Sequence, residues 1–252
     1  MSTTIFAVDN EKGGVGKSTT AIELAYFYAG KGADVILIDL DPLCAASHAC
    51  GVSGHEGATI ADVLAGRTTV DKCAQTRRIG KGWRSARIVP GSLDLEDAVT
   101  DLVAADDGVF ALRRALAGMS EPLTERVVVV DCPAGLNVLT LNALVAADVV
   151  LVPTTPHAWS IAGAYAVMGK VGEVNDVRAA YELPPITGAY TLVTMFDVRT
   201  SADREGLASV QADARLNYVG VVPRRTGRDA EQQIRGYSYI AFCKMHDRVI
   251  DL

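Results

Sequence analysis

A glycine-rich loop between an apolar run and a helical segment constrains this chain more than any other feature. Residues 5–8 read Ile-Phe-Ala-Val, and residues 12–19 read Lys-Gly-Gly-Val-Gly-Lys-Ser-Thr before an Ala- and Leu-rich stretch that predicts a helix over 17–31. Glycine permits backbone conformations that other residues avoid, so the N–H groups of the loop can approach phosphate oxygens. The start of a helix adds positive potential at the same place. The pattern predicts a phosphate-binding loop.

Individual residues of this loop have separate predicted roles. Lys17 is expected to reach the β- and γ-phosphates of ATP, and the Ser18 hydroxyl to coordinate magnesium. The usual pattern G-x-x-x-x-G-K-[ST] is not met in full, because Glu11 occupies its first glycine position and a second lysine, Lys12, lies inside the loop. The residues predicted to bind the nucleotide here are Lys12, Gly13, Gly14, Val15, Gly16, Lys17, Ser18 and Thr19.

Short apolar runs alternate with helical segments along the rest of the chain. Several runs are apolar throughout, as in strands of a parallel sheet that is covered on both faces. The alternation predicts a doubly wound α/β fold, a mostly parallel sheet flanked by helices. No linker or repeat divides the chain, so we expect a single P-loop ATPase domain over residues 1–252. The predicted strands are 5–8, 35–38, 87–89, 127–130, 149–152, 188–193 and 218–222, and the predicted helices are 17–31, 95–117, 137–146, 158–176 and 202–215.

Two predicted strands end in acidic residues, at the sheet edge where open α/β folds bind ligands. Asp39 and Asp41 end the second strand, and strand alternation places them on one side. Beside a triphosphate such a pair can organise magnesium and the attacking water, whereas without the loop it would be read as two solvated acids. Asp131 ends the run 127–130, where a carboxylate is expected near the magnesium. The predicted metal-site residues are Ser18, Asp39 and Asp131.

Composition excludes several classes of protein. The chain has 252 residues, of which 49% are hydrophobic and 21% charged, as in an ordinary globular protein with a sizeable core. No apolar run approaches the ~20 residues that span a bilayer, and the N-terminus lacks the features of a signal peptide. Five scattered cysteines without a C-x-x-C pair fit a reducing cytoplasm. The net charge of −6 opposes nucleic-acid binding by the chain as a whole, so any DNA contact requires a local basic patch.

Several segments, in order along the chain, resemble the ParA/MinD family of P-loop ATPases, which carry a deviant Walker A motif. Residues 12–19 resemble the family signature, residues 39–42 (Asp-Leu-Asp-Pro) its first switch motif and residues 131–133 (Asp-Cys-Pro) its second. Residues 146–156, 193–200 and 221–225 also look like the family. The chain departs from it at residues 43–45, where Gln-Gly-Asn is common, and at Ala134, where a second proline is commoner.

The resemblance implies roles that the residue pattern alone does not give. In such proteins the extra lysine, here Lys12, crosses the interface of an ATP-sandwich dimer and touches the nucleotide of the partner. By the same match Asp41 positions or activates the water, and Asp39 supports the metal site. Pro223 and Arg224 match a segment close to the adenine base in relatives. The implied catalytic residues are Lys12, Lys17 and Asp41.

Within this family the chain looks most like the small ParA-type partition ATPases. The loop begins within a dozen residues of Met1, which leaves no room for an N-terminal DNA-reading domain. The C-terminal segment has few cations, unlike the membrane-binding helix of MinD-type proteins. Relatives bind DNA non-specifically as ATP dimers, and arginines gathered in a surface patch can contact phosphate without reading sequence. The alternative for this chain is that its arginines form only a solvated face. The residues for such a patch are Arg199, Arg224, Arg225, Arg228 and Arg235, and a second basic cluster comprises Arg77, Arg78, Lys81, Arg84 and Arg87.

The resemblance thus implies a slow ATPase with ATP and Mg²⁺ as cofactors. It would form a homodimer when ATP is bound, hold non-specific DNA on the nucleoid in the cytoplasm, and respond to a ParB-like protein or a cargo adaptor without binding membrane. Two alternatives remain open at this point. One is a MinD-like membrane-positioning ATPase, and the other a metabolic or iron–sulfur assembly ATPase on the same fold. Cys132 is the residue that raises the iron–sulfur alternative, although no matched ligand set accompanies it.

Overall fold

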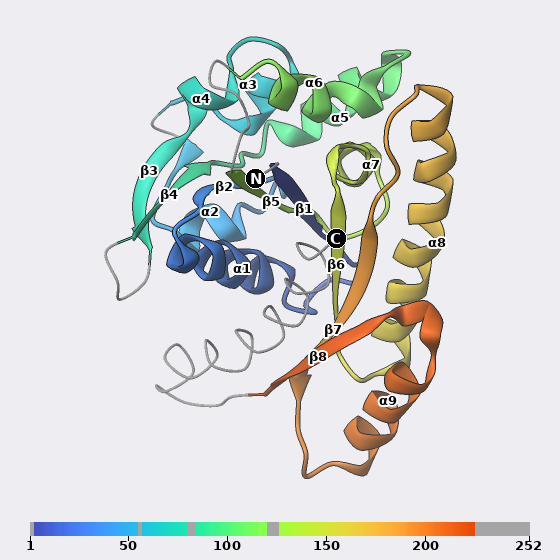
Figure 1. Cartoon of the computed structure of the whole chain (residues 1–252). Helices are drawn as coiled ribbons and strands as arrows, with labels where there is room; N and C mark the ends of the chain where they lie inside the picture. The colour runs from blue at the N-terminus through green and yellow to red at the C-terminus, as the bar shows by residue number, and fades with distance from the viewer. Residues whose placement is uncertain (1–2, 55–56, 80–83, 120–125, 225–252) are drawn as a thin grey trace.

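A mostly parallel sheet forms the centre of the molecule (Figure 1). The computed structural model describes residues 3–54, 57–79, 84–119 and 126–224. The sheet within them has eight strands in the order β3-β4-β2-β5-β1-β6-β7-β8, and only β3 runs antiparallel to its neighbour. The strands are β1 (Thr4–Val8), β2 (Asp34–Asp39), β3 (Gln75–Ile79), β4 (Arg84–Val89), β5 (Arg126–Asp131), β6 (Val149–Thr154), β7 (Gly188–Phe196) and β8 (Tyr218–Pro223).

Helices connect the parallel strands and cover both faces of the sheet, which confirms the predicted doubly wound α/β fold. The predicted helix 17–31 has the same bounds in the structure. The helices are α1 (Lys17–Lys31), α2 (Ala45–Ala49), α3 (Ile60–Leu64), α4 (Val70–Cys73), α5 (Leu95–Ala104), α6 (Ala111–Ala117), α7 (Val138–Ala146), α8 (Ala158–Ala180) and α9 (Ser201–Ala212), with short 3₁₀ turns η2 (Gly108–Phe110) and η3 (Ala214–Leu216).

The core lies in two layers, one on each face of the sheet. On β1, Phe6 and Val8 pack with α1, whereas Ile5 and Ala7 face the opposite layer, to which α3 to α8 contribute. The central strands are buried on both faces, and β5 is buried along its whole length. This double burial explains why the strands appear in the sequence as continuous apolar runs.

Each predicted strand is present, but the sequence analysis missed β3 and the short helices α2, α3 and α4. The edge strand β3 reads Gln-Thr-Arg-Arg-Ile and has no apolar run. Its pairing with β4 comes from the tertiary fold, because an antiparallel edge strand exposes one side to water and tolerates polar residues. The short helices contain only four or five residues, which is too few for helical periodicity to be recognised.

The predicted single helix 95–117 is wrong, because the chain turns between α5 and α6 at η2. Gly108 makes the turn possible. A Cβ atom at this position would lie 1.9 Å from the Leu102 carbonyl oxygen, so no other residue fits without a shift of the backbone. Asp106 and Asp107 precede this glycine, and that combination is a turn signal that the sequence analysis overlooked.

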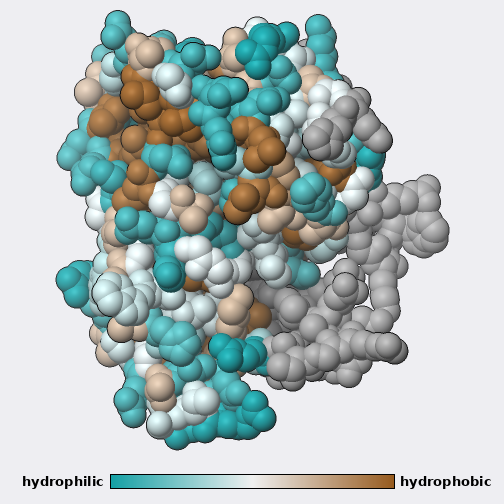
Figure 2. Space-filling model, turned by 180° about the vertical axis from the view of Figure 1, so that it is seen from behind, coloured by the Kyte–Doolittle hydropathy of each residue, from teal (hydrophilic) through white to brown (hydrophobic). Residues whose placement is uncertain are grey.

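The hydropathy of the surface differs between the upper and lower parts of the face seen from behind in Figure 2. Figure 2 shows apolar residues gathered in the upper part of this face, while polar residues dominate its lower part. No described helix is long and apolar enough to cross a bilayer.

Candidate functional site

The phosphate loop has the backbone geometry that its glycines predict, with one correction. Gly14 and Gly16 have φ angles of 76° and 89°, in the left-handed region that favours glycine. Gly13 does not have a positive φ, so its predicted need for special backbone freedom is not observed. Gly16 caps the N-terminus of α1 and its carbonyl oxygen accepts the first bond of the helix, from the Thr20 N–H at 2.9 Å. The loop therefore leads directly into the positive end of α1.

Lys17 lies inside this loop and is buried. Its Nζ donates to the carbonyl oxygens of Asn10 at 3.1 Å and of Lys12 at 3.2 Å. These bonds hold the ammonium group against the backbone of the loop. The side chain of Lys12 is exposed, whereas its backbone takes part in the loop through both its N–H and its carbonyl oxygen. The two lysines thus have different environments.

Asn10, which the sequence analysis did not single out, fixes the start of the loop. Its buried side-chain amide donates to the carbonyl oxygen of Pro153 at 2.8 Å and to that of Ser160 at 3.4 Å, and its Oδ1 accepts the Lys12 N–H at 2.8 Å. Helix α8 approaches closely here, since a Cβ atom on Gly163 would lie 2.4 Å from Asn10 Oδ1. An Asn two residues before a turn is a known signal for side-chain to backbone bonding.

Thr194 links the loop to the neighbouring strands. Its hydroxyl oxygen lies 2.7 Å from the Val15 carbonyl oxygen and 3.2 Å from that of Thr154, so its single proton serves the loop and the end of β6. The loop after β5 contributes as well, because the Gly135 N–H donates to the Glu11 carbonyl oxygen at 3.0 Å. The phosphate loop is therefore supported by the ends of β5, β6 and β7.

Asp39 and Asp131 lie opposite each other at the ends of adjacent strands, in one register. Both are fully buried. Asp39 is well supplied with donors, because its Oδ2 accepts from the Ser47 N–H at 2.7 Å and the Ser47 hydroxyl at 2.6 Å, and its Oδ1 accepts the Asp41 N–H at 3.2 Å. Burial nevertheless raises the pKa of Asp39. These partners fit an indirect contribution to a metal site, since both oxygens already serve the protein.

Asp131 has a different environment. Neither of its carboxylate oxygens has a hydrogen-bond partner within the described residues. Burial, followed by the nearby Asp39, raises the pKa of Asp131 well above 3.8, and the Ser18 hydroxyl and the Lys17 ammonium partly oppose this effect. A buried carboxylate that faces a hydroxyl group offers oxygen ligands of the kind that Mg²⁺ prefers. No group of three or more His, Cys, Asp or Glu forms a metal site by itself in the described residues, so the remaining ligands would come from phosphate and water.

Asp41 follows β2, close enough to Asp131 for its charge to raise that carboxyl's pKa, and is half-buried. Its Oδ1 accepts the Leu43 N–H at 2.9 Å, and its carbonyl oxygen accepts the Cys44 N–H at 2.9 Å. The turn is strained, because Cys44 has a φ of 55° although it is not a glycine. Asp41 thus sits in a tight turn beside the buried pair, with one carboxylate oxygen not engaged by that turn.

The arginines predicted to contact DNA fall into two groups. Arg199 is exposed, but it is paired with Asp197 through Nε–Oδ1 and Nη2–Oδ2 contacts of 2.9 and 2.6 Å, which neutralise its charge locally. Arg224 is exposed beyond Pro223 at the end of β8, and its N–H donates to the Phe196 carbonyl oxygen at 2.7 Å. The positions that lie outside the described residues are Arg225, Arg228 and Arg235.

In the second basic cluster, Arg87 is engaged in ion pairs with Asp34 at 2.9 Å and Asp71 at 3.4 Å. Arg77 bonds to the Gly51 carbonyl oxygen and to Gln75. Lys81 is outside the described residues, and the side chains of Arg78 and Arg84 are not described. The described members of this cluster therefore bond to other residues of the fold, and the cluster is a weaker candidate for a DNA-contacting patch.

Cys132 and Asp9 are two buried groups close to the phosphate loop. Cys132 is fully buried, and burial raises the pKa of its thiol well above 9.0, as in an apolar core position. Asp9 is fully buried at the end of β1, and its carboxylate has no hydrogen-bond partner within the described residues. Burial raises the pKa of Asp9 to about 7, although the Lys17 ammonium opposes the shift.

Comparison with known proteins finds relatives that are named as ATPases or partitioning proteins, in agreement with a phosphate loop at this site. A family model described as "AAA domain" matches residues 3–182, more than half of the chain. The chain is 31% identical over 202 residues to the chromosome-partitioning ATPase Soj of Treponema pallidum (strain Nichols), covering 80% of this chain and 75% of that protein. It is 32% identical over 224 residues to the chromosome partitioning protein ParA of Caulobacter vibrioides (strain NA1000 / CB15N), covering 87% and 80%.

A solved structure is similar along the whole chain. It is cobyrinic acid a,c-diamide synthase from Mycobacterium smegmatis with bound ADP and magnesium, which is 27% identical and has a TM-score of 0.79. The match covers 98% of this chain and 95% of that one. A protein with a similar overall fold therefore holds ADP and magnesium.

Replacing Asp9 by Asn should flatten the dependence of stability on pH. The carboxyl has a pKa of about 7 in the folded chain and about 3.8 in the unfolded chain, so between these values the folded chain keeps a proton that the unfolded chain has lost. The free energy of unfolding should therefore fall as pH rises from about 4 to about 7, by about 2 to 4 kcal/mol. Urea unfolding of wild type and Asp9→Asn between pH 5 and pH 8 measures this.

Asp106→Asn, at an exposed position, is the control and should leave the pH profile unchanged. Equal pH profiles for wild type and Asp9→Asn would contradict the assignment of a raised pKa to Asp9.

Proposed function

The chain belongs to the ParA/Soj family of P-loop ATPases, and from this premise we propose that it is an ATP-dependent switch of the ParA type. In this proposal residues 1–252 act as one P-loop ATPase domain, which dimerises with ATP bound and holds DNA without reading its sequence. It thereby positions a plasmid, a chromosome or a protein cargo on the nucleoid. The observation that carries the proposal is the phosphate loop, whose buried Lys17 lies beside the paired strand ends that bear Asp39 and Asp131.

The nucleotide would bind through the backbone and two side chains of the loop. The N–H groups of residues 12–19 and the positive end of α1 attract the phosphates, and Lys17 supplies a cation that the carbonyl oxygens of the loop already hold in place. Ser18 and Asp131 would hold magnesium, which neutralises phosphate charge when bound. Asp39 would act through Ser47 and the backbone that it orders. Pro223 and Arg224 would lie towards the adenine base.

Hydrolysis would depend on Asp41. The turn that holds this carboxylate keeps it next to the buried acids while leaving it half accessible to water. A carboxylate placed in this way can orient the water that attacks the γ-phosphate. Turnover would be slow without help, and a ParB-like protein or a cargo adaptor would accelerate it.

Dimerisation would depend on the exposed side chain of Lys12. Because the backbone of Lys12 supports the loop while its side chain is exposed, the ammonium group is available to a nucleotide held by a second copy. ATP would then favour the dimer over the monomer through contacts that exist only in the dimer.

DNA binding would depend on exposed arginines. Arg224 is exposed and forms no ion pair with the described residues, although its charge acts on Asp197, whereas Arg199 is paired with Asp197. A DNA-binding patch would therefore rely on Arg224 with Arg225, Arg228 and Arg235. Phosphate contacts by such arginines hold DNA without selecting sequence.

A metabolic enzyme on the same fold is the second candidate, because the similar solved structure is an amide-forming synthase. Such an enzyme would bind a small-molecule acceptor at the site and would not require DNA. The sequence relatives, which are named for chromosome partitioning, favour the switch.

The chain should be retained on random-sequence duplex DNA with ATP and magnesium, and not with ADP or without nucleotide. Retention should fall as salt rises, because each phosphate contact releases a counterion. The double variant Arg224→Ala/Arg225→Ala should reduce retention at least about tenfold. Co-sedimentation at low and moderate salt measures this, with nucleotide affinity determined in parallel, since Arg224 is also assigned to the nucleotide.

Arg67→Ala is a matched control, because Arg67 is exposed and pairs with Asp62 far along the chain from the patch. A chain that binds no DNA in any nucleotide state would remove the DNA-positioning function and favour the synthase alternative.

Lys12→Gln should abolish ATP-dependent dimers while the monomer still binds nucleotide. Glutamine keeps the backbone bonds of residue 12 and removes only the ammonium group, so the loop should remain folded. Analytical ultracentrifugation with a non-hydrolysable ATP analogue measures the dimer. Lys72→Gln, at an exposed position on α4, should dimerise normally. Dimers of Lys12→Gln that persist with the analogue would remove the role proposed for Lys12.

Asp41→Ala should lower the rate of ATP hydrolysis by about 100-fold or more and leave ATP affinity within about threefold, because the side chain serves the water and not the phosphates. Phosphate release in single turnover measures the rate. Asp106→Ala, another accessible aspartate, should hydrolyse ATP at the wild-type rate. Normal hydrolysis by Asp41→Ala would contradict the catalytic assignment.

A further inference from the structure

Asp9 is a buried acid to which the proposed nucleotide site gives no role. It follows β1, and its N–H donates to the Leu151 carbonyl oxygen at 3.0 Å, so the ladder between β1 and β6 continues through it. Its side chain is fully buried, and neither carboxylate oxygen has a hydrogen-bond partner within the described residues. A buried carboxyl group is costly to ionise unless a positive charge lies near it.

Asp9 lies on the opposite face of the sheet from Asp131, the acid assigned to magnesium. Ala7, two residues before Asp9, packs in the core layer to which α3 to α8 contribute. Val129, two residues before Asp131, packs in the layer of α1. Side chains alternate along a strand, so Asp9 follows Ala7 to one face and Asp131 follows Val129 to the other.

Lys17 is the cation that acts on acids of both faces. Its Nζ donates to the carbonyl oxygen of Asn10, the residue next to Asp9, at 3.1 Å, and to that of Lys12 at 3.2 Å. An ammonium group has three N–H donors, so one remains for a phosphate or a carboxylate. Burial raises the pKa of Asp9 and of Asp131, and the same ammonium opposes both shifts. A bound phosphate and an ionised Asp9 would thus share one positive charge.

The titratable groups around Asp9 come from α1, the loop and the end of β5. Burial raises the pKa of Asp9 to about 7, the Lys17 ammonium and the Asn10 backbone oppose this shift, and the exposed Glu11 adds to it. On the β5 side, burial, followed by the charge of Asp9, raises the pKa of the Cys132 thiol well above 9.0, so that this neighbour is neutral near pH 7.

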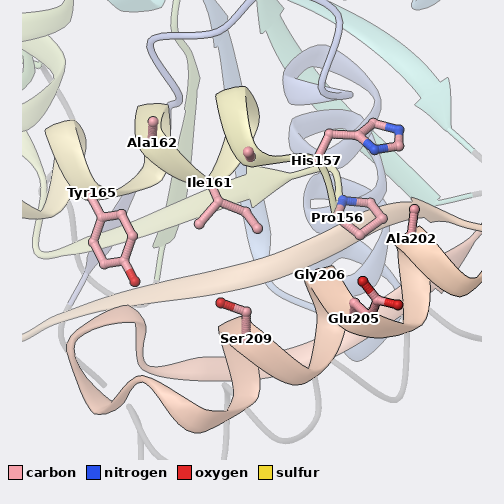
Figure 3. Close-up of a pocket in the computed structure, with 10 residues that line it drawn as sticks. Pro156, His157, Ile161, Ala162, Tyr165, Ala202, Glu205, Gly206 and Ser209 are labelled. Carbon is pink, nitrogen blue, oxygen red and sulfur yellow. The ribbon is translucent and has the colours of Figure 1, made fainter.

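Helices α7 and α8 meet this region with uncharged groups. No residue of α7 carries a charge, and α8 approaches the start of the loop through Ser160 and Gly163. The titratable side chains in the first turns of α8, His157 and Tyr165, line the space between α8 and α9 instead (Figure 3). The ammonium group of the loop is therefore the positive charge that compensates an ionised Asp9.

We propose that Asp9 is a second counter-ion of Lys17 that competes with the nucleotide for its positive charge, so that nucleotide binding is coupled to the uptake of a proton by Asp9. Phosphates in the loop engage the ammonium group and add negative charge of their own, which disfavours an ionised Asp9. Asp9 then takes a proton from the solvent and becomes neutral. The inference rests on the proposed function, because it requires that the loop binds nucleotide.

The direction of the pH effect follows from these two states. Below about pH 7 Asp9 keeps its proton with or without nucleotide, so affinity should not depend on it there. Above that pH the free chain has lost a proton that the nucleotide-bound chain keeps, so affinity falls as pH rises until the bound carboxyl also ionises. If nucleotide raises the pKa of Asp9 by about one unit, affinity should fall about sevenfold between about pH 6 and about pH 8.5.

Isothermal titration calorimetry with ADP and excess magnesium measures the coupling, because ADP tests the loop without hydrolysis. Titrations at pH 8 in two buffers of different ionisation enthalpy give the number of protons taken up. Wild type should take up about 0.4 protons more per ADP than Asp9→Asn. The difference between the two chains cancels the protons that ADP, Asp39 and Asp131 exchange on their own.

Affinity provides a second readout, in which the variant gains binding. Asp9→Asn should bind ADP as wild type does at pH 6 and about sevenfold more tightly at pH 8.5, because an amide does not compete for the charge of Lys17. Asp9→Ala should give the same flat profile, so the test does not depend on how asparagine fits the buried position. Asp106→Asn, at an exposed position, is the control and should keep the wild-type profile.

Equal proton uptake by wild type and Asp9→Asn would overturn the proposal, and so would equal ADP affinity of the two chains at pH 8.5. Binding that Asp9→Asn weakens by the same factor at both pH values would reduce Asp9 to a support of the fold and would also overturn it. A wild-type chain that binds no ADP at any pH would defeat the switch function together with this inference. ADP binding without a difference at Asp9 would defeat this inference alone.

Discussion

The register in which β5 pairs with both β1 and β2 is the constraint on which the site depends. Asp131 is the Cα partner of Asp39 on one side and of Val8 on the other. One residue of slippage would turn Asp131 to the opposite face of the sheet and separate it from the loop that follows β1. Continuous apolar burial on both faces fixes that register, because each shift would expose or crowd the core. The hydrophobic core therefore sets the geometry of the acids.

The buried acids make the site electrostatically unbalanced. Asp9, Asp39 and Asp131 are all fully buried, while Lys17 is the buried cation that opposes the shifts of Asp9 and Asp131. Carboxylates taken out of water without a counter-charge cost free energy unless they are protonated or meet a cation. Ser47 donates two hydrogen bonds to Asp39, whereas no hydrogen bond from the described residues reaches the carboxylate oxygens of Asp131 and Asp9. A fold that tolerates this imbalance at the end of a phosphate loop is suited to a site that gains a cation with its ligand.

The first turns of helix α8 support the start of the phosphate loop. They hold Asn10 on one side and line the space between α8 and α9 on the other. Asn10 in turn holds the backbone of Lys12, the residue on which the proposed dimer contact depends. A rigid element of this kind transmits a displacement from one surface to the other because packed helices move as units.

The sequence by itself determined the described strands other than β3, the phosphate loop and the position of Asp131, because each depends on residues close together in the chain. Continuous apolar runs, the left-handed Gly14 and Gly16, and an acid at the end of a run are local signals. Only the tertiary structure decided which polar groups meet. The Ser47 donors to Asp39 and the space between α8 and α9 follow from how elements pack, and no periodicity encodes them. Gly108 and Gly206 allow close approaches to Leu102 and Pro156, and those contacts become visible only when the chain is folded.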